Sequence, residues 1–530
     1  MTRIDTATLH AWLMDGRELA LLDAREEGEF GASHLFWAVP CPLSQREIRA
    51  RAILPRQSTR VVCVDGGRGL AERLAAWLEG DGCTGVHVLD GGTAAWERAG
   101  NVLFSGVNVP SKAFGEWVEH HYGTESVDPP ELKSWIESGR KMVVLDSRTQ
   151  DEFVRMSIPS AINVPGGELA YRIGDLAPDP ETLVVVNCAG RTRSIMGAES
   201  LRRAGVPNRV VALRNGTMGW ELAGFGCERG RAERFPPGTP ATAAAALRRA
   251  QAFAEASGVG VIGALDFARF EEDANRTLYL LDVRDPPEFR AGHRPGSRSA
   301  PGGQLVQATD QWIGVRNARI VLLDDTGVRA RMAGAWLRQM GHRDVFVVDG
   351  GLDEVRDSGT ALAPVPELAA PAPLIDVGSF AALLDTGERV AVVDVARSVD
   401  FRDGHIPGAL WGVRTRLDLL RRDLAGAQRV VVTSPDGLFA RLAVGEVAEL
   451  TGTRVAALEG GTAAWRTSGR SLASDRTNPP DSDCIDFHLR PYDRHSGQEA
   501  AMRAYLSWEI DLVREIARDG TVRFGIDADA

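Results

Sequence analysis

The sequence is poor in the residues that build cross-linked or metal-held scaffolds. Its 530 residues include six cysteines and ten histidines. The cysteines form no Cys-x-x-Cys pair and the histidines do not cluster at ligand spacing, which excludes a disulfide framework and a zinc site. We therefore expect no metal, no organic cofactor, and cysteines that stay free in a reducing compartment.

Long apolar runs and excess positive charge are also absent. No run approaches the ~18 apolar residues of a membrane helix, and the first residues lack the apolar core of a signal peptide. The net charge of −11 does not favour non-specific binding to nucleic acids. The sequence thus predicts a cytoplasmic protein without membrane or nucleic-acid partners.

The chain does contain an internal repeat: one sequence unit occurs four times. Its first mark is a strand that ends in an acid and is followed by a charged helix start. The second mark is a strand, a short loop and an amphipathic helix, as in VVVNCAGRTRSIMGAESL. The third is a strand followed by Gly-Gly or Asn-Gly and usually a tryptophan. The first mark begins at Leu21, Val144, Leu280 and Val392.

Each unit alternates short β-branched strands with longer helical patterns. This alternation is typical of the α/β class, with a parallel sheet flanked by helices on both faces. A unit of about 100 residues is large enough to bury a core of its own. We place unit one at 1–108, unit two at 123–236, unit three at 258–362 and unit four at 374–472. Pro-rich linkers separate units two and three, and units three and four.

A tail of residues 473–530 follows the last unit. It begins polar and Pro-rich, and its periodicity predicts a helix from Gln498 to about Arg518. The apolar stripe of this helix is expected to dock on the surface of a domain. The stripe consists of Ala501, Tyr505, Trp508 and Leu512.

The most informative segment is the loop of the second mark in unit two. Cys188 follows a buried strand and precedes a helix, within the sequence NCAGRTRS. Unpaired N–H groups and the dipole of a helix N-terminus favour thiolate over thiol, as do neighbouring arginines. The pattern therefore indicates sulfur chemistry or anion capture at Cys188, although a small buried core cysteine is the alternative.

These three marks, in this order, resemble the rhodanese sulfurtransferases, and the resemblance covers all four units. It implies repeated small rhodanese-like domains and a persulfide relay. In such a relay, a cysteine thiolate takes sulfur from a small anionic donor such as thiosulfate or a mercaptoacid. It then passes the sulfur to cyanide, a thiol or a protein. The resemblance assigns no cofactor and leaves the oligomeric state open.

Carried over to this sequence, the resemblance makes Cys188 the nucleophile. The loop N–H groups would hold the persulfide, the arginines would bind the donor, and Ser194 could donate a hydrogen bond to sulfur. Asp146, Arg148 and Glu152 would brace the site, while Gly216 and Trp220 look like turn and core positions. The implied binding residues are Ala189, Gly190, Arg191, Thr192, Arg193, Ser194 and, further away, Arg172.

The other three units depart from the pattern at the cysteine. Unit one has Asp65 there, unit three has Asp324 or Asp325, and unit four has Ser434. An aspartate cannot form a persulfide, and a serine without a base is a poor nucleophile. We expect units one, three and four to be inactive copies that support, dock or regulate unit two.

Two other functions fit parts of the pattern. A phosphatase or arsenate reductase of similar architecture uses a Cys-x5-Arg loop, but only four residues separate Cys188 from Arg193. A shorter loop favours a sulfur atom over a phosphate. A sulfur carrier or scaffold that serves a protein partner is also compatible with one active unit beside three silent ones.

Overall fold

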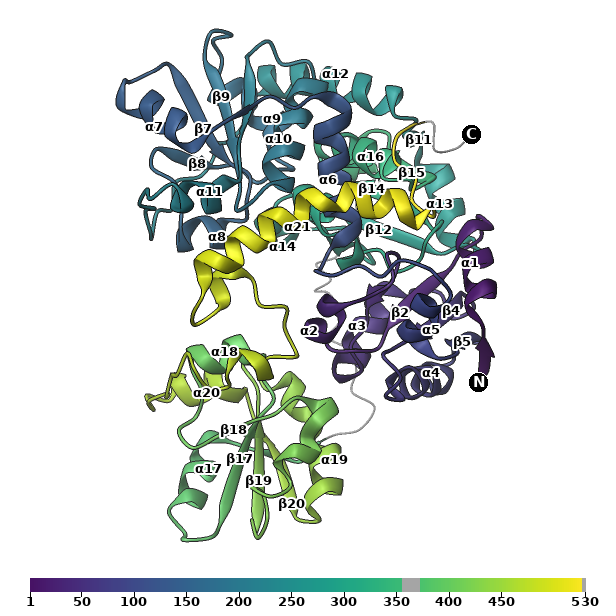
Figure 1. Cartoon of the computed structure of the whole chain (residues 1–530), viewed down its shortest axis with the longest axis vertical. Helices are drawn as coiled ribbons and strands as arrows, with labels where there is room; N and C mark the ends of the chain where they lie inside the picture. The colour runs from purple at the N-terminus through teal and green to yellow at the C-terminus, as the bar shows by residue number, and fades with distance from the viewer. Residues whose placement is uncertain (355–371, 527–530) are drawn as a thin grey trace.

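The computed structural model of the chain describes residues 1–354 and 372–526. Within these residues it contains four five-stranded sheets with one strand order, the first being β1-β5-β4-β2-β3 (Figure 1). Neighbouring strands in every sheet are parallel, and helices flank the sheets. This confirms the predicted fold class, an α/β protein made of repeated small units.

Units one and two are joined by a helix, α6 (Val109–Tyr122). Unit one comprises β1 (Thr2–Ile4), α1 (Thr6–Met14), β2 (Ala20–Asp23), α2 (Glu27–Ala32), β3 (Val39–Pro40), η1 (Leu43–Gln45), α3 (Arg46–Ile53), β4 (Arg60–Val64), α4 (Leu70–Gly80), β5 (Gly85–Leu89) and α5 (Gly92–Arg98). Unit two comprises β6 (Ser126–Val127), α7 (Pro129–Glu137), β7 (Met142–Asp146), α8 (Gln150–Arg155), β8 (Ala161–Asn163), α9 (Leu169–Leu176), β9 (Leu183–Asn187), α10 (Thr192–Arg203), β10 (Val210–Leu213) and α11 (Gly216–Leu222).

A second connecting helix, α12 (Pro240–Ala256), precedes unit three. Unit three comprises β11 (Gly260–Ile262), α13 (Ala264–Glu272), β12 (Leu278–Asp282), α14 (Pro286–Ala291), β13 (Arg298–Ser299), α15 (Gly302–Gln307), η2 (Thr309–Gln311), β14 (Arg319–Leu323), α16 (Val328–Gln339), β15 (Asp344–Val348) and η3 (Gly351–Glu354). The predicted end of this unit at residue 362, and most of the Pro-rich spacer after it, lie outside the described residues.

Unit four repeats the pattern and leads into the tail. It comprises β16 (Leu374–Ile375), α17 (Val377–Leu384), β17 (Val390–Asp394), α18 (Ser398–Asp403), β18 (Leu410–Trp411), η4 (Arg414–Leu420), β19 (Arg429–Thr433), α19 (Leu438–Thr451), β20 (Arg454–Leu458) and α20 (Gly461–Thr467). The tail contains η5 (Asp481–Asp483), η6 (Pro491–Asp493) and α21 (Gln498–Asp519).

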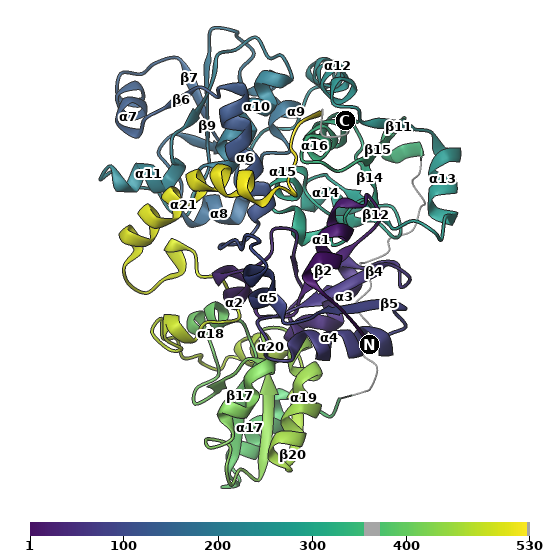
Figure 2. The ribbon, with the colours of Figure 1, turned by 45° about the vertical axis from the view of Figure 1, so that its right-hand side comes forward.

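The tail helix α21 returns across the molecule to unit two. It packs against α6 and crosses between the second and first units in both views (Figures 1 and 2). Its inward face is apolar except for one acid, since Met502, Leu506, Leu512 and Ile516 are buried together with Glu509. The tail therefore docks on a surface built by other units, more than 300 residues away in sequence.

Units one, two and three share a continuous apolar core. One cluster of buried side chains includes Leu22 of unit one, Ile195 of unit two and Leu281 of unit three. The buried clusters of unit four consist of its own residues and a few from the adjoining segments. Unit four is thus attached to unit one mainly by polar contacts, among them the ion pairs of Arg414 with Glu47 and of Arg416 with Glu29.

Glu26 lies in that polar contact and is fully buried. Its carboxyl oxygens accept hydrogen bonds from Ser44 Oγ at 2.8 Å and from Thr415 Oγ1 of unit four at 2.7 Å. Burial raises the pKa of Glu26 to about 7, although both hydrogen bonds favour the charged form. Below pH 7 the folded chain therefore keeps a proton that an unfolded chain loses near pH 4.5.

We expect Glu26→Gln to stabilise the protein at pH 8 and to have little effect at pH 5. The folded state binds more protons than the unfolded state between about pH 4.5 and 7, so wild-type stability falls as the pH rises through this window. The loss is on the order of 3 kcal/mol, at about 1.4 kcal/mol for each unit of pKa shift. Melting temperatures of the wild type and the variant between pH 5 and pH 8 measure this loss of stability. The exposed Glu97→Gln is the control. A gain that was equal at both pH values would contradict this account.

Candidate active site

Cys188 lies where the central strand of the second sheet ends. Strand β9 ends at Asn187 and α10 begins at Thr192, so the loop between them faces the N-terminus of a helix. All five residues of β9 are buried, because helices cover both faces of a parallel sheet. Cys188 is 2% exposed. The N-terminal N–H groups of α10 favour negative charge at the loop.

A glycine after the neighbouring strand fixes the path of this loop. The N–H groups of Thr217 and Met218 donate to the carbonyl oxygens of Cys188 and Ala189 at 2.8 and 2.9 Å. Gly216 adopts a φ of +53°, and a Cβ there would lie 2.3 Å from the carbonyl oxygen of Cys188. Only glycine fits such a position, which explains why the third sequence mark carries glycine.

The thiol of Cys188 is less acidic than the sequence pattern indicates. Burial raises the pKa of the Cys188 thiol, while Arg193 and the hydrogen bond with Ser194 act in the opposite direction without outweighing burial. Ser194 is also oriented differently from the prediction. Its hydroxyl donates to the carbonyl oxygen of Arg191 at 2.8 Å and accepts from the Cys188 thiol at 3.5 Å.

Arg193 is paired with an acid. Its guanidinium donates to both oxygens of Glu152, at 2.6 and 2.8 Å. Glu152 is positioned by a capping box with Thr149 at the start of α8. Burial opposes the ionisation of Glu152, but Arg193 and Arg148 outweigh it and lower its pKa. Arg193 and Glu152 both line the cavity of Cys188, so this pair forms part of its wall.

Arg191 ties the loop to the helix between units one and two. It donates to both oxygens of Glu116 at 2.7 and 2.8 Å and forms a further ion pair with Glu119. Both acids belong to α6, and Arg191 Nη1 lies 3.3 Å from Asn215 Oδ1. In the resting protein Arg191 therefore anchors the loop, and its charge is matched by two carboxylates.

The acid at the end of the second strand of the unit holds an arginine in three of the units. In unit two, Arg148 donates to Asp146 through Nε at 2.9 Å and Nη2 at 2.7 Å, both side chains being buried. Asp23 with Arg25 and Asp282 with Arg284 repeat this contact. Unit four has alanine at the arginine position, and burial raises the pKa of its Asp394 to about 7.

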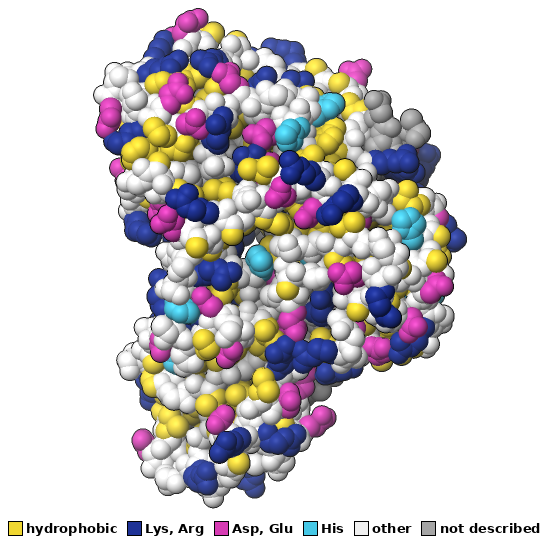
Figure 3. Space-filling model, viewed as in Figure 1, with side chains coloured by type: hydrophobic (Ala, Val, Ile, Leu, Met, Phe, Trp, Pro, Cys, Tyr) yellow, Lys and Arg dark blue, Asp and Glu magenta, His cyan; other side chains and the backbone are white. Residues whose placement is uncertain are grey.

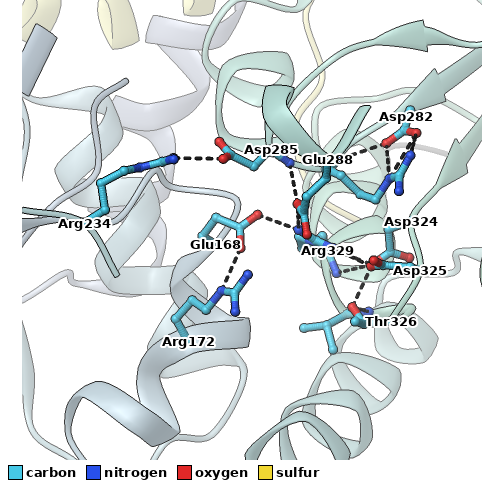
Figure 4. Close-up of polar contacts among 12 residues, drawn as sticks. Glu168, Arg172, Arg234, Asp282, Asp285, Glu288, Asp324, Asp325, Thr326 and Arg329 are labelled. Carbon is cyan, nitrogen blue, oxygen red and sulfur yellow. Dashed lines mark hydrogen bonds and ion pairs between the residues drawn. The ribbon is translucent and has the colours of Figure 1, made fainter. Parts of the chain in front are cut away.

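Arg172 lies away from Cys188. Its Nε donates to Glu168 at 3.0 Å, and its guanidinium lies 4.6 Å from the ring centre of Phe235. The same Glu168 accepts from Arg329 of unit three (Figure 4). Arg172 therefore belongs to the interface of units two and three, does not line the cavity, and is not part of the donor site that we propose.

Cys188 opens into a cavity of about 540 Å³ whose walls come from several parts of the chain. Unit two supplies the Cys188 loop, unit three supplies Gln304 to Trp312, and the tail supplies residues from Arg476 to Glu509. Eight basic and five acidic side chains line it. The excess of positive charge suits a small anion.

Sequence reasoning missed three residues of this wall: Lys112 from α6, and Tyr505 and Glu509 from α21. The tail stripe includes Tyr505, but it predicts only a docking role for this residue. Glu509 is four positions further along the helix, on the same face, so a buried acid within an apolar stripe was the available signal.

The corresponding loops of the other units place an acid or a hydroxyl at the position of Cys188. Asp65, Asp324 and Ser434 each directly follow the central strand, which resolves the unit-three position as Asp324. The carboxylate of Asp65 accepts from the N–H groups of Gly67, Arg68 and Leu70 at 2.8 to 3.0 Å. The loop of unit one thus holds a fixed anion and carries no sulfur.

The described residues contain no group of three or more His, Cys, Asp or Glu side chains that could hold a metal ion. None of the helices in residues 1–354 and 372–526 is long and apolar enough to cross a membrane. On the face seen in Figure 3, basic and acidic side chains are interspersed and no area of one sign stands out.

Comparisons with known proteins match this architecture. Four segments, residues 5–99, 128–223, 266–358 and 376–468, match the family model of the rhodanese-like domain. A solved structure of a thiosulfate sulfurtransferase from Pseudomonas aeruginosa is similar over 99% of each chain, with 44% sequence identity and a TM-score of 0.93.

Curated relatives match shorter stretches. A putative sulfur carrier protein of Bacillus subtilis is 24% identical over 151 residues, which is 26% of this chain and 78% of the relative. An HTH-type transcriptional regulator of Mycobacterium tuberculosis is 32% identical over 107 residues, 20% of this chain. The chain spans about half the length of that regulator, 46%.

Proposed function

Because this chain belongs to the rhodanese-like domain family, as its repeated motifs predicted, we propose that it is a sulfurtransferase. It moves a sulfane sulfur from thiosulfate, or a similar small anion, to a thiophilic acceptor through a persulfide on Cys188. The P. aeruginosa protein that it resembles along 99% of its length is named a thiosulfate sulfurtransferase.

One observation carries the assignment of the site. Four loops occupy the same place after the central strand of a sheet, and among them Cys188 alone offers a sulfur. It also opens into the cavity with an excess of basic side chains. Units one, three and four then serve as supports: unit three contributes a wall of the cavity, and unit one packs in a shared core with units two and three.

The first half of the reaction is a displacement at sulfur. The Cys188 thiolate attacks the outer sulfur of thiosulfate, the S–S bond of the donor breaks, and its electron pair leaves with sulfite. Cys188 keeps the transferred sulfur as Cys–S–S⁻. Because burial raises the pKa of the thiol, ionisation needs the positive surroundings that Arg193 and the N-terminus of α10 supply.

The acceptor is a small molecule in this proposal. Cys188 is 2% exposed and the tail forms part of the wall of its cavity, so we expect that the cysteine of a protein partner would have to displace the tail. Cyanide and small thiols need no such change. The sulfur-carrier alternative, favoured by the B. subtilis relative, would require an open path. We also place the protein in the cytoplasm, where a free Cys188 is maintained.

The test is the mass of the intact protein after incubation with thiosulfate or with mercaptopyruvate. We expect a gain of about 32 Da, one sulfur, that disappears when cyanide is added, as covalent catalysis requires. The donor that loads the protein faster is the better substrate, and the excess of basic side chains in the cavity walls favours thiosulfate. No gain with either donor would contradict the proposed function, and an aryl phosphate assay would then test the phosphatase alternative.

A further inference from the structure

The Cys188 cavity has a wall built by helices that lie outside the rhodanese-like units. Helix α6 falls between the matched segments 5–99 and 128–223, and α21 follows the last segment, which ends at residue 468. The two helices pack against each other (Figures 1 and 2). Their facing side chains Lys112, Tyr505 and Glu509 all line the cavity.

Glu509 is held in place through one of its two oxygens. Oε1 accepts from Tyr505 Oη at 2.8 Å, from Thr192 Oγ1 at 3.1 Å and from Lys112 Nζ at 3.2 Å. Lys112 also donates to the hydroxyl of Tyr505. Thr192 is the first residue of α10, so this network attaches the tail directly to the helix that follows Cys188.

The other oxygen of Glu509 has no partner among the described residues, although the side chain is only 1% exposed. Burying a carboxylate oxygen without a hydrogen bond costs folding free energy. The presence of such an oxygen in the cavity therefore indicates that it receives a ligand or a proton. It points toward the loop, since a Cβ added to Gly190 would lie 3.2 Å from this oxygen. Glu509 also acts electrostatically on Cys188 and opposes ionisation of its thiol.

We propose that Glu509 is the general base for thiol acceptors in the second half of the reaction. This rests on the proposed function. The acceptor RSH gives its proton to the free oxygen of Glu509, and the resulting thiolate attacks the outer sulfur of Cys–S–S⁻. The S–S bond to Cys188 breaks, Cys188 leaves as a thiolate, and RS–S⁻ departs. The proton on Glu509 then returns to solvent.

The surroundings of Glu509 suit this role. Lys112 forms an ion pair with Glu509, while Tyr505 and Thr192 fix its orientation. The acceptor class follows from the chemistry: a thiol must lose a proton before it attacks, whereas cyanide attacks as an anion. The charged or titratable groups that face Glu509 are Lys112 and Glu116 of α6, Arg191 and Cys188 of the loop, and Tyr505 of α21.

Glu509→Gln tests the proposal, because the amide keeps an oxygen for the three hydrogen bonds and removes the base. We expect full loading with sulfur from thiosulfate, no slower than in the wild type because a charge that opposes ionisation of Cys188 is removed, and no loss in the rate of transfer to cyanide. Transfer to dithiothreitol at neutral pH should fall on the order of a hundredfold, the usual contribution of a positioned base. The loss should shrink as the pH rises or when the more acidic trifluoroethanethiol replaces dithiothreitol, and Glu509→Asp should restore part of the rate.

Glu499→Gln, an exposed change on the same helix, is the matched control and should affect neither acceptor. An equal loss with cyanide and with dithiothreitol, or no loss with either, would overturn the role of Glu509. Failure of the variant to load while the wild type loads would overturn it as well. If the wild type itself does not load, the proposed function fails instead, so the two outcomes are distinguishable.

Discussion

Replacing Cys188 with serine should abolish sulfur loading and leave the fold intact. Turnover with thiosulfate and cyanide should fall on the order of a thousandfold or more, as expected when a covalent nucleophile is removed. Serine has a precedent at this position: Ser434 of unit four occupies the same place, where its hydroxyl accepts from the N–H of Ala440 at 3.2 Å. The melting temperature should therefore change little.

Cys227→Ser is the matched control for this experiment. Cys227 is half-buried, whereas the other five cysteines are buried, so it is the thiol most open to adventitious sulfur. Burial raises the pKa of Cys227 to about 12, which makes it a poor nucleophile at neutral pH. The control should load and turn over like the wild type. Full activity in the Cys188 variant, or loss of loading in the Cys227 variant, would refute a single reactive cysteine.

The second large effect concerns stability, and we expect it on replacing Arg329 with methionine. Arg329 is almost fully buried in α16 and faces carboxylates from two units (Figure 4). Its Nη1 lies 2.8 Å from Glu168 of unit two and 2.6 Å from Glu288 of unit three, and it also pairs with Asp325. Removal would leave Glu288 and Asp325 without this cation and Glu168 with Arg172 alone, at a cost of about 3–5 kcal/mol.

Hydrogen exchange in α9 and α16 is the measurement for this variant, since a chain of four units does not unfold in one step. Exchange should rise in both helices, because Glu168 lies just before α9. Arg269→Met, at an exposed ion pair with Asp266 on α13, should change stability by less than 1 kcal/mol. The double variant Arg329→Met/Glu168→Gln should recover part of the stability that Arg329→Met loses. Additive effects of the two substitutions on stability would refute an energetic coupling between Arg329 and Glu168.

The repeats made the fold predictable, because each strand and helix carries its own local signal and the signal recurs four times. Cys188 was recognisable for the same reason: it follows a β-branched strand and precedes a helix. The low acidity of its thiol was not predictable, because burial of Cys188, which raises the pKa of the thiol, depends on the tertiary packing. The arginines in its loop are visible in the sequence, but Glu152 and Glu116, which pair with them, come from other helices.

The site residues that the sequence did not predict are brought together by long-range contacts. Lys112 and Glu509 meet although 397 residues separate them, and no local pattern relates them. For Arg172 the sequence prediction was wrong in the other sense: it named a donor-binding residue that lies away from Cys188. Its distance from Cys188 depends on the packing of unit three against α9, where Glu168 and Arg329 meet. The sequence predicts a tail helix with a docking stripe, and α21 packs against α6. The buried face differs from the predicted one, because Leu512 alone of the four stripe residues is buried. The periodicity also says nothing about the surface that the helix covers.

The position of α21 in the chain has a consequence for synthesis. A ribosome releases all four units before α21, and domains generally fold in the order in which they emerge. Units one to three can therefore assemble around Cys188 while the wall that holds Glu509 is still missing. During that interval the thiol is more open to oxidants and to stray sulfur than in the finished protein. Closure of the site thus waits for the synthesis of α21, and a product truncated before α21 would carry a more exposed thiol.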